Sequence, residues 1–363
     1  MKIKRYRSEK KIRINDLTKK LIVGGLVFVC VAILFFSIFI IIKSVGKNSL
    51  RKHANEVVNH ELSSGLNDEM AEKEVLELKE GQILVNGEVY EYDEDILTFL
   101  CMGVDSRSGI SETKTPGKGG QADALLMVVV NPGKETIQVI ALNRDTMTEI
   151  DVYDVNGLYM GKEKGQITLQ YAYGDGREKS CELMEQKVSE LFYGIPIHGY
   201  GALAMQSIAT LNDAVGGVEV TIPEDMTKFK AGWTEGAKVQ LYGEDALLFV
   251  QRRDITHAQT NLGRVERQKQ YLTKYVEQLK KKIKSDVTFP VTLLGQIQKH
   301  LVTSLSVEEI TYLADTLMGY EFSMGNIINI PGETKMGEKH EEFYVDDSAL
   351  KELIIDVFYE KVQ

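Results

Sequence analysis

The strongest constraint on the fold of this chain is a pair of apolar runs rich in β-branched residues, at positions 125–130 and 137–142. An Asn-Pro-Gly-Lys turn at 131–134 joins them. Sheet-forming residues on both sides of a Pro-Gly turn predict an antiparallel hairpin. A hairpin returns the chain to the edge of the sheet where it began. Side chains that precede the first strand and follow the second are therefore expected to be neighbours.

Charged residues occupy both of those outer positions. Asp123 precedes the first strand, and Arg144 and Asp145 follow the second. A third apolar run, residues 96–104, ends at Asp105 and adds a second carboxylate if it pairs in the same sheet. The sequence thus predicts that carboxylates and an arginine converge at one sheet edge.

Carboxylates beside arginines suit a phosphate and its metal. Magnesium is often held by one or two carboxylates together with substrate phosphate oxygens, and Asp105 and Asp123 fit that role. Arginine binds phosphate oxygens through a charged, bidentate fork. Taken singly, each charge could instead be solvated or ion-paired, and only the convergence favours a site. The candidate phosphate contacts are Arg144, Arg253, Arg264 and Arg267, with Gln268 beside the last.

An uncharged segment predicts a membrane anchor. Residues 21–42 carry no charge and are long enough for a transmembrane helix, which needs about 20 residues. Nine Lys and Arg residues against two acidic ones precede this segment, so the positive-inside rule predicts a cytoplasmic N-terminus. A cleaved signal peptide is the rival, but the run is too long and no small-residue cleavage site follows it. We expect a single-pass protein of the cell membrane with an extracytoplasmic C-terminal part.

The expected organisation has four parts. Residues 1–20 form a basic cytoplasmic tail, 21–42 the transmembrane helix, 43–80 a charged extracytoplasmic stalk and 81–363 the globular domain. An Asn-Gly hairpin signal at 86–87 marks the start of that domain. The net charge of −10 includes the basic tail, so the outer part is more acidic still, which argues against nucleic acid as a partner.

Within the domain, apolar spacing predicts the main helices. They cover residues 180–192, 202–215 and 264–284; a strand is expected over 218–222, and a helix or helix-to-strand passage over 241–250. Arg264 and Arg267 share a face of the last helix at i and i+3. Apolar and aromatic residues of these helices are expected in the core, with a groove for a lipid tail as the alternative. The two cysteines after the anchor predict no disulfide framework.

Several short motifs occur in the order typical of one family. Gly-Val-Asp-Ser-Arg ends at residue 107, Asn-Arg-Asp-Thr covers 143–146, and Asp-Ala-Val-Gly-Gly-Val covers 213–218. Gly-Arg-Val-Glu-Arg-Gln follows at 263–268. Through these motifs the chain resembles the LytR-CpsA-Psr family over about residues 94–280.

The resemblance implies a fold and an activity. The fold is an α/β one, a mixed twisted β-sheet packed between helices in an α/β/α arrangement, with a hydrophobic pocket for a polyprenyl tail. The activity is attachment of anionic glycopolymers, of teichoic acid or capsule type, from a polyprenyl pyrophosphate carrier to peptidoglycan. The resemblance also implies Mg²⁺ on Asp105 and Asp123, and pyrophosphate contacts from Arg107, Arg144, Arg253, Arg264, Arg267 and Gln268.

This chemistry agrees with the charges found above. Phosphoryl transfer depends mainly on positioning and charge neutralisation, with a carboxylate to take the acceptor proton. The catalytic residues expected here are Arg144, Asp145 and Arg253. Asp123 or Asp145 could be the base, but for Asp145 an ion pair that orients an arginine is the alternative.

Three departures from the family pattern leave two classes of function open. Gln121 and Gln251 stand where arginines are usual, and Asn261 where an aspartate is usual. The favoured function is a membrane-anchored, magnesium-dependent phosphotransferase. The alternative is a non-catalytic scaffold that binds polyprenyl-linked glycan. A transcriptional regulator is disfavoured because the cytoplasmic tail of about 20 residues is shorter than a helix-turn-helix domain.

Overall fold

The structure is a computed structural model that describes residues 42–50, 52, 66, 78–106, 109–252, 260–338 and 340–362. The predicted anchor, residues 21–42, lies outside the described residues except for its last position, as does most of the predicted stalk. Within the described ranges, no helix combines the length and the apolar character that crossing a membrane requires. The proposed boundaries at residues 20 and 42 therefore stay predictions.

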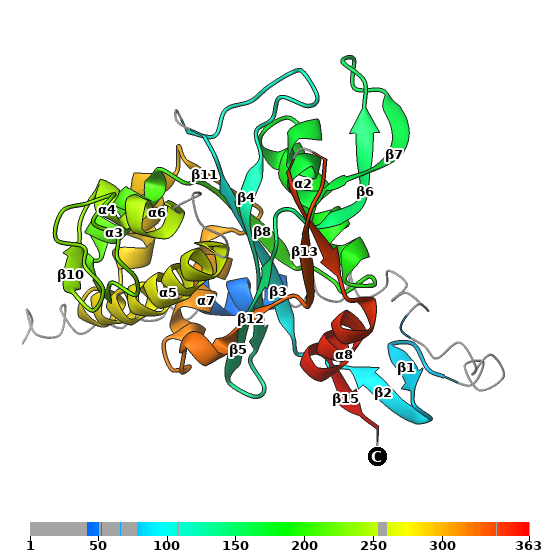
Figure 1. The fold of residues 1–363 in the computed structure, drawn as a ribbon. Helices are drawn as coiled ribbons and strands as arrows, with labels where there is room; N and C mark the ends of the chain where they lie inside the picture. The colour runs from blue at the N-terminus through cyan, green and yellow to red at the C-terminus, as the bar shows by residue number, and fades with distance from the viewer. Residues whose placement is uncertain are drawn as a thin grey trace, which may run out of the picture.

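A six-stranded mixed sheet forms the centre of the fold (Figure 1). Three neighbouring strands in the middle of the sheet pair antiparallel, and a parallel strand is added on each side of them. The strands in spatial order are β11 (Leu301–Thr303), β8 (Gly199–Ala204), β3 (Leu97–Val104), β4 (Ala122–Asn131), β5 (Thr136–Leu142) and β12 (Ile327–Asn329). The expectation of a mixed sheet is confirmed.

The predicted hairpin is β4–β5. Its register sets Leu125 opposite Leu142. The side chain of Asn131 organises the turn, since its Oδ1 accepts a hydrogen bond from the Lys134 backbone N–H at 2.9 Å. Its Nδ2 donates to Asp93 at 2.7 Å. An asparagine that bonds its own backbone a few residues on is a turn-forming device, which explains why this short sequence was a reliable signal.

Helices cover both faces of the sheet (Figure 1). Alternate residues of a strand point to opposite faces, and Leu125 and Met127 accordingly pack in the core with α2, whereas Ala124 and Leu126 face the other layer. The first layer contains η3 (Ile167–Tyr173), α2 (Glu178–Leu191), α8 (Asp347–Phe358) and the hairpin of β6 (Met147–Tyr153) and β7 (Tyr159–Gln166). The second contains α3 (Ser207–Ala214), α4 (Glu244–Gln251), α5 (Thr260–Ser285) and α6 (Phe289–Ile297).

Smaller elements surround these layers. The Asn86-Gly87 signal is confirmed as a hairpin, with φ of 53° and 75° at its two turn residues. It joins β1 (Gln82–Val85) to β2 (Glu88–Tyr92), and β15 (Tyr359–Lys361) adds a third strand. The other elements are β9 (Val218–Thr221), β10 (Lys238–Leu241), α7 (Val307–Leu317), η4 (Met324–Asn326), β13 (Gly332–Met336) and β14 (Glu341–Val345).

One helix prediction is wrong in its first half. Residues 202–215 were expected to be helical, but residues 199–204 form β8 and only 207–214 form α3. Ala202 and Ala204 have high helix propensity, yet both are fully buried where β8 pairs between β3 and β11. Sheet pairing with distant strands outweighs that local preference. The helices predicted over 180–192 and 264–284 are confirmed as α2 and α5.

Glu185 on α2 is expected to make stability depend on pH. Burial, with a further contribution from Glu182, raises the pKa of Glu185 to about 7 from its ordinary 4.5. The folded state then binds this proton more tightly than the unfolded state, so the contribution to stability is complete below pH 4.5 and is lost as the pH rises through 7. We expect Glu185→Gln to be more stable than the parent by roughly 1–2 kcal/mol at pH 8.

Thermal unfolding measured between pH 4.5 and 8 checks this expectation. The two proteins should have nearly equal melting temperatures at pH 4.5 and diverge as the pH rises. Glu352→Gln, at an exposed position on α8, is the matched control and should follow the parent at every pH. A constant offset between Glu185→Gln and the parent would contradict the titration.

Candidate functional site

A β-bulge places Asp123 at one end of the central strands, where β3 ends and β4 begins; this end is the sheet edge that the sequence predicted. The pairing of β3 with β4 shifts between Gly103 and Val104, and Asp123 is the extra residue on β4. Bulges interrupt pairing and re-aim side chains, often next to functional sites. Just beyond, the Asp105 backbone N–H donates to the Gln121 carbonyl at 3.2 Å. The ends of both strands are thereby tied together with their carboxylates at the same edge.

Arg144 meets two carboxylates there, as the hairpin predicted. Its Nη1 donates to Asp123 Oδ1 at 2.7 Å, and its Nε lies 3.4 Å from Asp145 Oδ1. Asp145 Oδ1 also accepts a hydrogen bond from Gln166 Nε2 at 3.0 Å. The Arg144 side chain is 36% exposed, so its guanidinium is oriented by the protein and still open to a ligand.

The charges of Asp105 and Arg264 also act on Asp123. Burial raises the pKa of the Asp123 carboxyl, Arg144 opposes that shift, Asp105 adds to it and Arg264 opposes it. Charges influence a pKa in this way only when they lie near the titrating group. We call Asp105, Asp123, Arg144 and Arg264 the edge cluster. Its four residues come from four places along the chain: after β3, on β4, after β5 and on α5.

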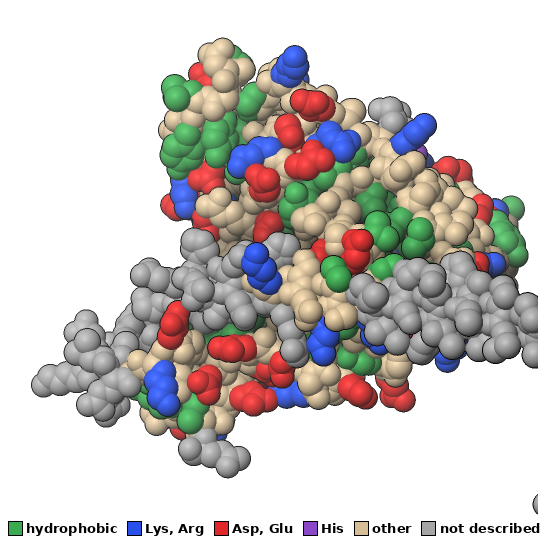
Figure 2. Space-filling model, turned by 180° about the vertical axis from the view of Figure 1, so that it is seen from behind, with side chains coloured by type: hydrophobic (Ala, Val, Ile, Leu, Met, Phe, Trp, Pro, Cys, Tyr) green, Lys and Arg blue, Asp and Glu red, His purple; other side chains and the backbone are tan. Residues whose placement is uncertain are grey.

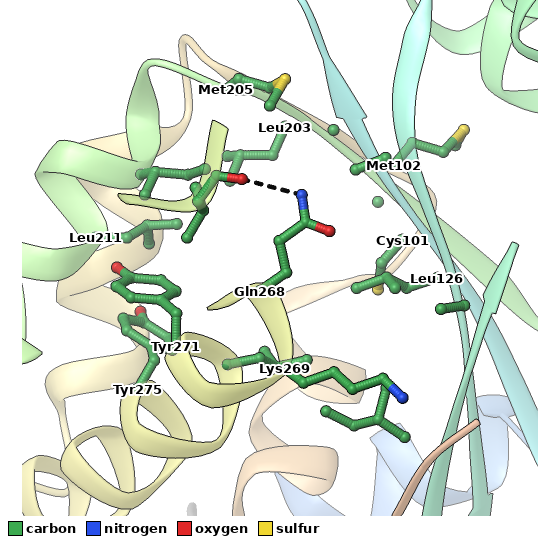
Figure 3. Close-up of a pocket in the computed structure, with 18 of the residues that line it drawn as sticks. Cys101, Met102, Leu126, Leu203, Met205, Leu211, Gln268, Lys269, Tyr271 and Tyr275 are labelled. Atoms are coloured by element: carbon green, nitrogen blue, oxygen red, sulfur yellow. Dashed lines mark hydrogen bonds between the residues drawn. The ribbon is translucent and has the colours of Figure 1, made fainter. Parts of the chain in front are cut away.

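An apolar cavity of about 420 Å³ lies between the sheet and the second helical layer (Figure 3). Cys101 and Leu126 of the sheet face Leu211 and Tyr271 of the helices across it. Desolvation by its apolar surroundings raises the pKa of the Cys101 thiol to about 11, so this wall residue is neutral. A volume of this size is typical of ligand sites. An apolar cavity is therefore present beside these helices, and its use by a lipid tail stays a prediction.

One end of the cavity is lined by residues adjacent in sequence to the edge cluster. Its wall includes Gly103, Ala124 and Val265. Ala124 follows Asp123, Val265 follows Arg264, and Gly103 stands two residues before Asp105. An apolar chamber thus begins where the charged group ends.

The comparison with known proteins decides the family. A profile of the LytR_cpsA_psr family matches residues 63–354, most of the chain. The protein belongs to this family. The chain is 28% identical over 261 residues to a protein of Bacillus cereus (strain AH820) named polyisoprenyl-teichoic acid–peptidoglycan teichoic acid transferase TagU. That similarity covers 71% of this chain and 76% of the relative.

Solved structures share the fold of this LytR_cpsA_psr protein. The protein gbs0355 from Streptococcus agalactiae aligns with a TM-score of 0.56 and 21% identity, over 72% of this chain and 87% of its own. The structure described as TagT bound to LI-WTA aligns with a TM-score of 0.54 and 21% identity, over 74% and 92%. At these identities the similarity confirms the fold, a mixed sheet between helices.

The two aspartates have the donor chemistry for a magnesium ion that is completed by a ligand, and the metal itself stays a prediction. Among residues 42–362 that the structure describes, no three His, Cys, Asp or Glu side chains form a group that could hold a metal ion. Asp105 raises the pKa of Asp123, which means that the two anionic forms repel, and a cation between them would relieve this repulsion. Magnesium commonly takes one or two carboxylates and draws its other oxygens from water and phosphate. The pair has the chemistry for such a site.

Arg267 has partners that the sequence did not reveal. Its side chain is only 1% exposed, and its Nε donates to the Phe249 carbonyl at 2.8 Å. The other guanidinium nitrogens bind the Glu224 carboxylate and the Arg252 carbonyl. In this structure Arg267 joins α5 to the end of α4, whereas the sequence predicted that it contacts pyrophosphate. That contact stays a prediction.

The remaining candidates are divided between described and undescribed positions. Gln268 Nε2 donates to the Val250 carbonyl at 3.1 Å beside the cavity (Figure 3). Gln121 and Gln251, which stand where the family usually has arginines, are exposed. Arg107 and Arg253 lie outside the described residues, so their assignments stay predictions.

Proposed function

We propose that this protein is a transferase that moves an anionic glycopolymer from a polyprenyl pyrophosphate carrier to peptidoglycan. The observation that carries the proposal is the junction of the edge cluster with the apolar cavity. A polyprenyl pyrophosphate has an anionic head and an apolar tail, and each part finds a counterpart on one side of that junction. The TagU relative, named as a teichoic acid transferase, supports the reaction class.

The residues of the edge cluster would bind and orient the pyrophosphate. Arg144, held by Asp123 and Asp145, and Arg264 offer positive charge to its oxygens. Mg²⁺ at Asp105 and Asp123 would neutralise further phosphate charge when it is bound. Phosphoryl transfer needs mainly this positioning and neutralisation. An acceptor hydroxyl would attack the phosphorus nearer the glycan, the bond to the second phosphate would break, and polyprenyl phosphate would leave.

The proton of the acceptor needs a base, for which the sequence left two candidates. The Asp145 carboxylate already accepts from Gln166 and lies against Arg144. These contacts favour the orienting role for Asp145. Asp123 is then the remaining candidate for the base, with one of its carboxylate oxygens held by Arg144.

A membrane location is part of the proposal. The polyprenyl carrier resides in a bilayer, and the uncharged segment at 21–42 with its basic flank is suited to anchor the protein there. The catalytic domain would then work on the extracytoplasmic side, where peptidoglycan is assembled.

The second candidate is a scaffold that binds the lipid-linked glycan without turnover. It is favoured by Gln121 and Gln251, since two positive charges usual in the family are missing. One assay separates the two functions: the full chain in detergent micelles with a polyprenyl pyrophosphate glycan, oligomeric peptidoglycan and magnesium. Release of polyprenyl phosphate with glycan joined to peptidoglycan supports the transferase. Tight donor binding with no transfer supports the scaffold.

Filling the cavity is expected to weaken donor binding. Gly201 on β8 lines the cavity, and a Cβ added there meets no atom within 4 Å. Gly201→Phe should therefore occupy space meant for the tail without disturbing the sheet. Displacing about two methylene groups of the tail would weaken binding about tenfold.

Equilibrium binding of a labelled polyprenyl pyrophosphate glycan measures this loss. Gly201→Ala is the matched control, because it adds one carbon and should bind like the parent. If Gly201→Phe folds normally and keeps parental affinity, the tail does not lie in this cavity.

A further inference from the structure

A run of lysines ends α5, away from the edge cluster. Four of the five residues from Lys280 to Lys284 are lysines, and Asp286 is the single carboxylate between residues 278 and 298. Lys281, Lys282 and Lys284 are exposed. Lysines in the last turn of a helix complement its dipole, but that effect does not require so many. In a chain of net charge −10, this is a marked local reversal of sign.

Exposed apolar residues follow the lysines at the corner between α5 and α6. Val287 is 75% exposed and Val291 is 52% exposed. The corner is ordered, because Phe289 is buried between them and Lys282 Nζ lies 5.8 Å from the centre of its ring. We call Lys281, Lys282, Lys284, Val287 and Val291 the lysine corner. Lysines beside exposed apolar side chains are the composition of surfaces that bind anionic membranes.

The lysine corner lies near the place where the predicted anchor ends. Lys43 directly follows the predicted span and forms an ion pair with Asp315 near the end of α7. Tyr320, just past α7, accepts a hydrogen bond through its carbonyl from Lys280 at the start of the lysine run. Lys43 and the lysine run are therefore linked through the end of α7, by the Lys43–Asp315 ion pair and the Lys280–Tyr320 hydrogen bond. A membrane that holds the anchor would pass close to this corner.

The cavity also leads from the edge cluster toward this corner. α5 lines the cavity from Val265 to Tyr275. Lys281 follows Tyr275 by six residues, which is about 9 Å along a helix axis at 1.5 Å per residue. The end of the cavity opposite the edge cluster is thus the end nearest the lysines, as a tail that reaches into a bilayer would require.

We propose that the lysine corner rests on an anionic phospholipid surface and points the far end of the cavity at the bilayer. This inference depends on the membrane location in the proposed function. Lysine ammonium groups would meet lipid phosphates, and the two valines would enter the apolar boundary beneath them. The contact would orient the domain, which a single anchor alone does not do.

The tip of the β6–β7 hairpin is the alternative membrane contact. Val155, Leu158 and Met160 are exposed there, and apolar side chains gather over this hairpin at the upper left of Figure 2. The tip turn is built on the Asp154 carboxylate, which accepts from the Leu158 N–H at 2.8 Å. It lies at the other side of the molecule from α5 and α6 (Figure 1). An acidic turn far from Lys43 suits an anionic surface less well.

Lipid quenching of tryptophan fluorescence tests the proposal. The chain has one tryptophan, Trp233, which is buried at 4% exposure, so an added surface tryptophan reports its own surroundings. The full chain carrying Val287→Trp is reconstituted in vesicles of phosphatidylglycerol and brominated phosphatidylcholine. We expect at least twofold stronger quenching than in the parent. Val155→Trp is the matched control at 74% exposure and should show no added quenching.

A second set of substitutions tests whether the lysine charges are needed for this contact. Lys281→Gln, Lys282→Gln and Lys284→Gln combined with Val287→Trp should return quenching to the parental level, as should vesicles without phosphatidylglycerol. Parental quenching of Val287→Trp, or strong quenching of Val155→Trp instead, would overturn the proposal. The readout needs no donor and no turnover. A protein that is quenched as expected but inactive would count against the transferase and leave the lysine corner standing.

Discussion

Asp123→Asn is expected to reduce glycopolymer transfer about 100- to 1000-fold, the range seen when one preorganised charge-stabilising group is removed from an active site. The variant loses the negative charge that holds Arg144 through a 2.7 Å hydrogen bond. It also loses one of the two carboxylates proposed for Mg²⁺. Because asparagine has nearly the same size, the bulge of β4 should persist and the protein should still fold.

The measurement is the initial rate of polyprenyl phosphate release over a series of magnesium concentrations. The parent should respond to magnesium, whereas the variant should be slow and nearly insensitive to it. Asp93→Asn is the matched control, since Asp93 is paired with Lys134 at 3.0 Å at the opposite end of the β4–β5 hairpin. A parental rate in Asp123→Asn would remove this residue from the reaction.

Arg267→Ala is expected to destabilise the protein by about 3 kcal/mol, because a buried charged group that bonds several partners is removed at once. The carbonyls of Phe249 and Arg252 would lose their donors, and a cavity would open between α4 and α5. Glu224 would lose its partner too, but its side chain is 45% exposed, so water can solvate it. Because Glu224 can be solvated, the expected loss of stability lies at the lower end of the range for breaking a buried ion pair.

Denaturant or thermal unfolding at pH 7 measures this effect. For a domain of this size, about 3 kcal/mol corresponds to a fall in melting temperature of roughly 6–12 °C. Lys274→Ala is the matched control on the same helix, since Lys274 makes an exposed pair with Glu277 at 3.1 Å and surface pairs contribute little. If Arg267→Ala melts like the parent, the arginine does not hold α4 to α5, and the predicted pyrophosphate contact becomes the better account of this residue.

Local patterns predicted the elements whose contacts are near in sequence. The β4–β5 turn bonds within itself through Asn131, and the Asn86-Gly87 turn needs only its own backbone angles. α2 and α5 follow their apolar periodicity. In each of these cases the interactions that fix the element lie within the segment itself.

Predictions failed or fell short where distant segments decide. β8 took residues that were expected to begin a helix because it pairs with β3, about 100 positions earlier, and with β11, about 100 positions later. Helical spacing placed Arg264 and Arg267 on one face, but spacing does not distinguish a residue near Asp123 from one buried against Phe249. Packing against α4 makes that distinction.

The sequence by itself determined the family and the sheet edge at which Asp123, Arg144 and Asp145 meet, because a hairpin and ordered motifs are short-range features. The tertiary structure alone decided the bulge that aims Asp123, the burial of Arg267 and the cavity that begins beside the edge cluster. Each of these results from surfaces of separate segments packing together. Their shape depends on the partners across the interface, which no single segment encodes.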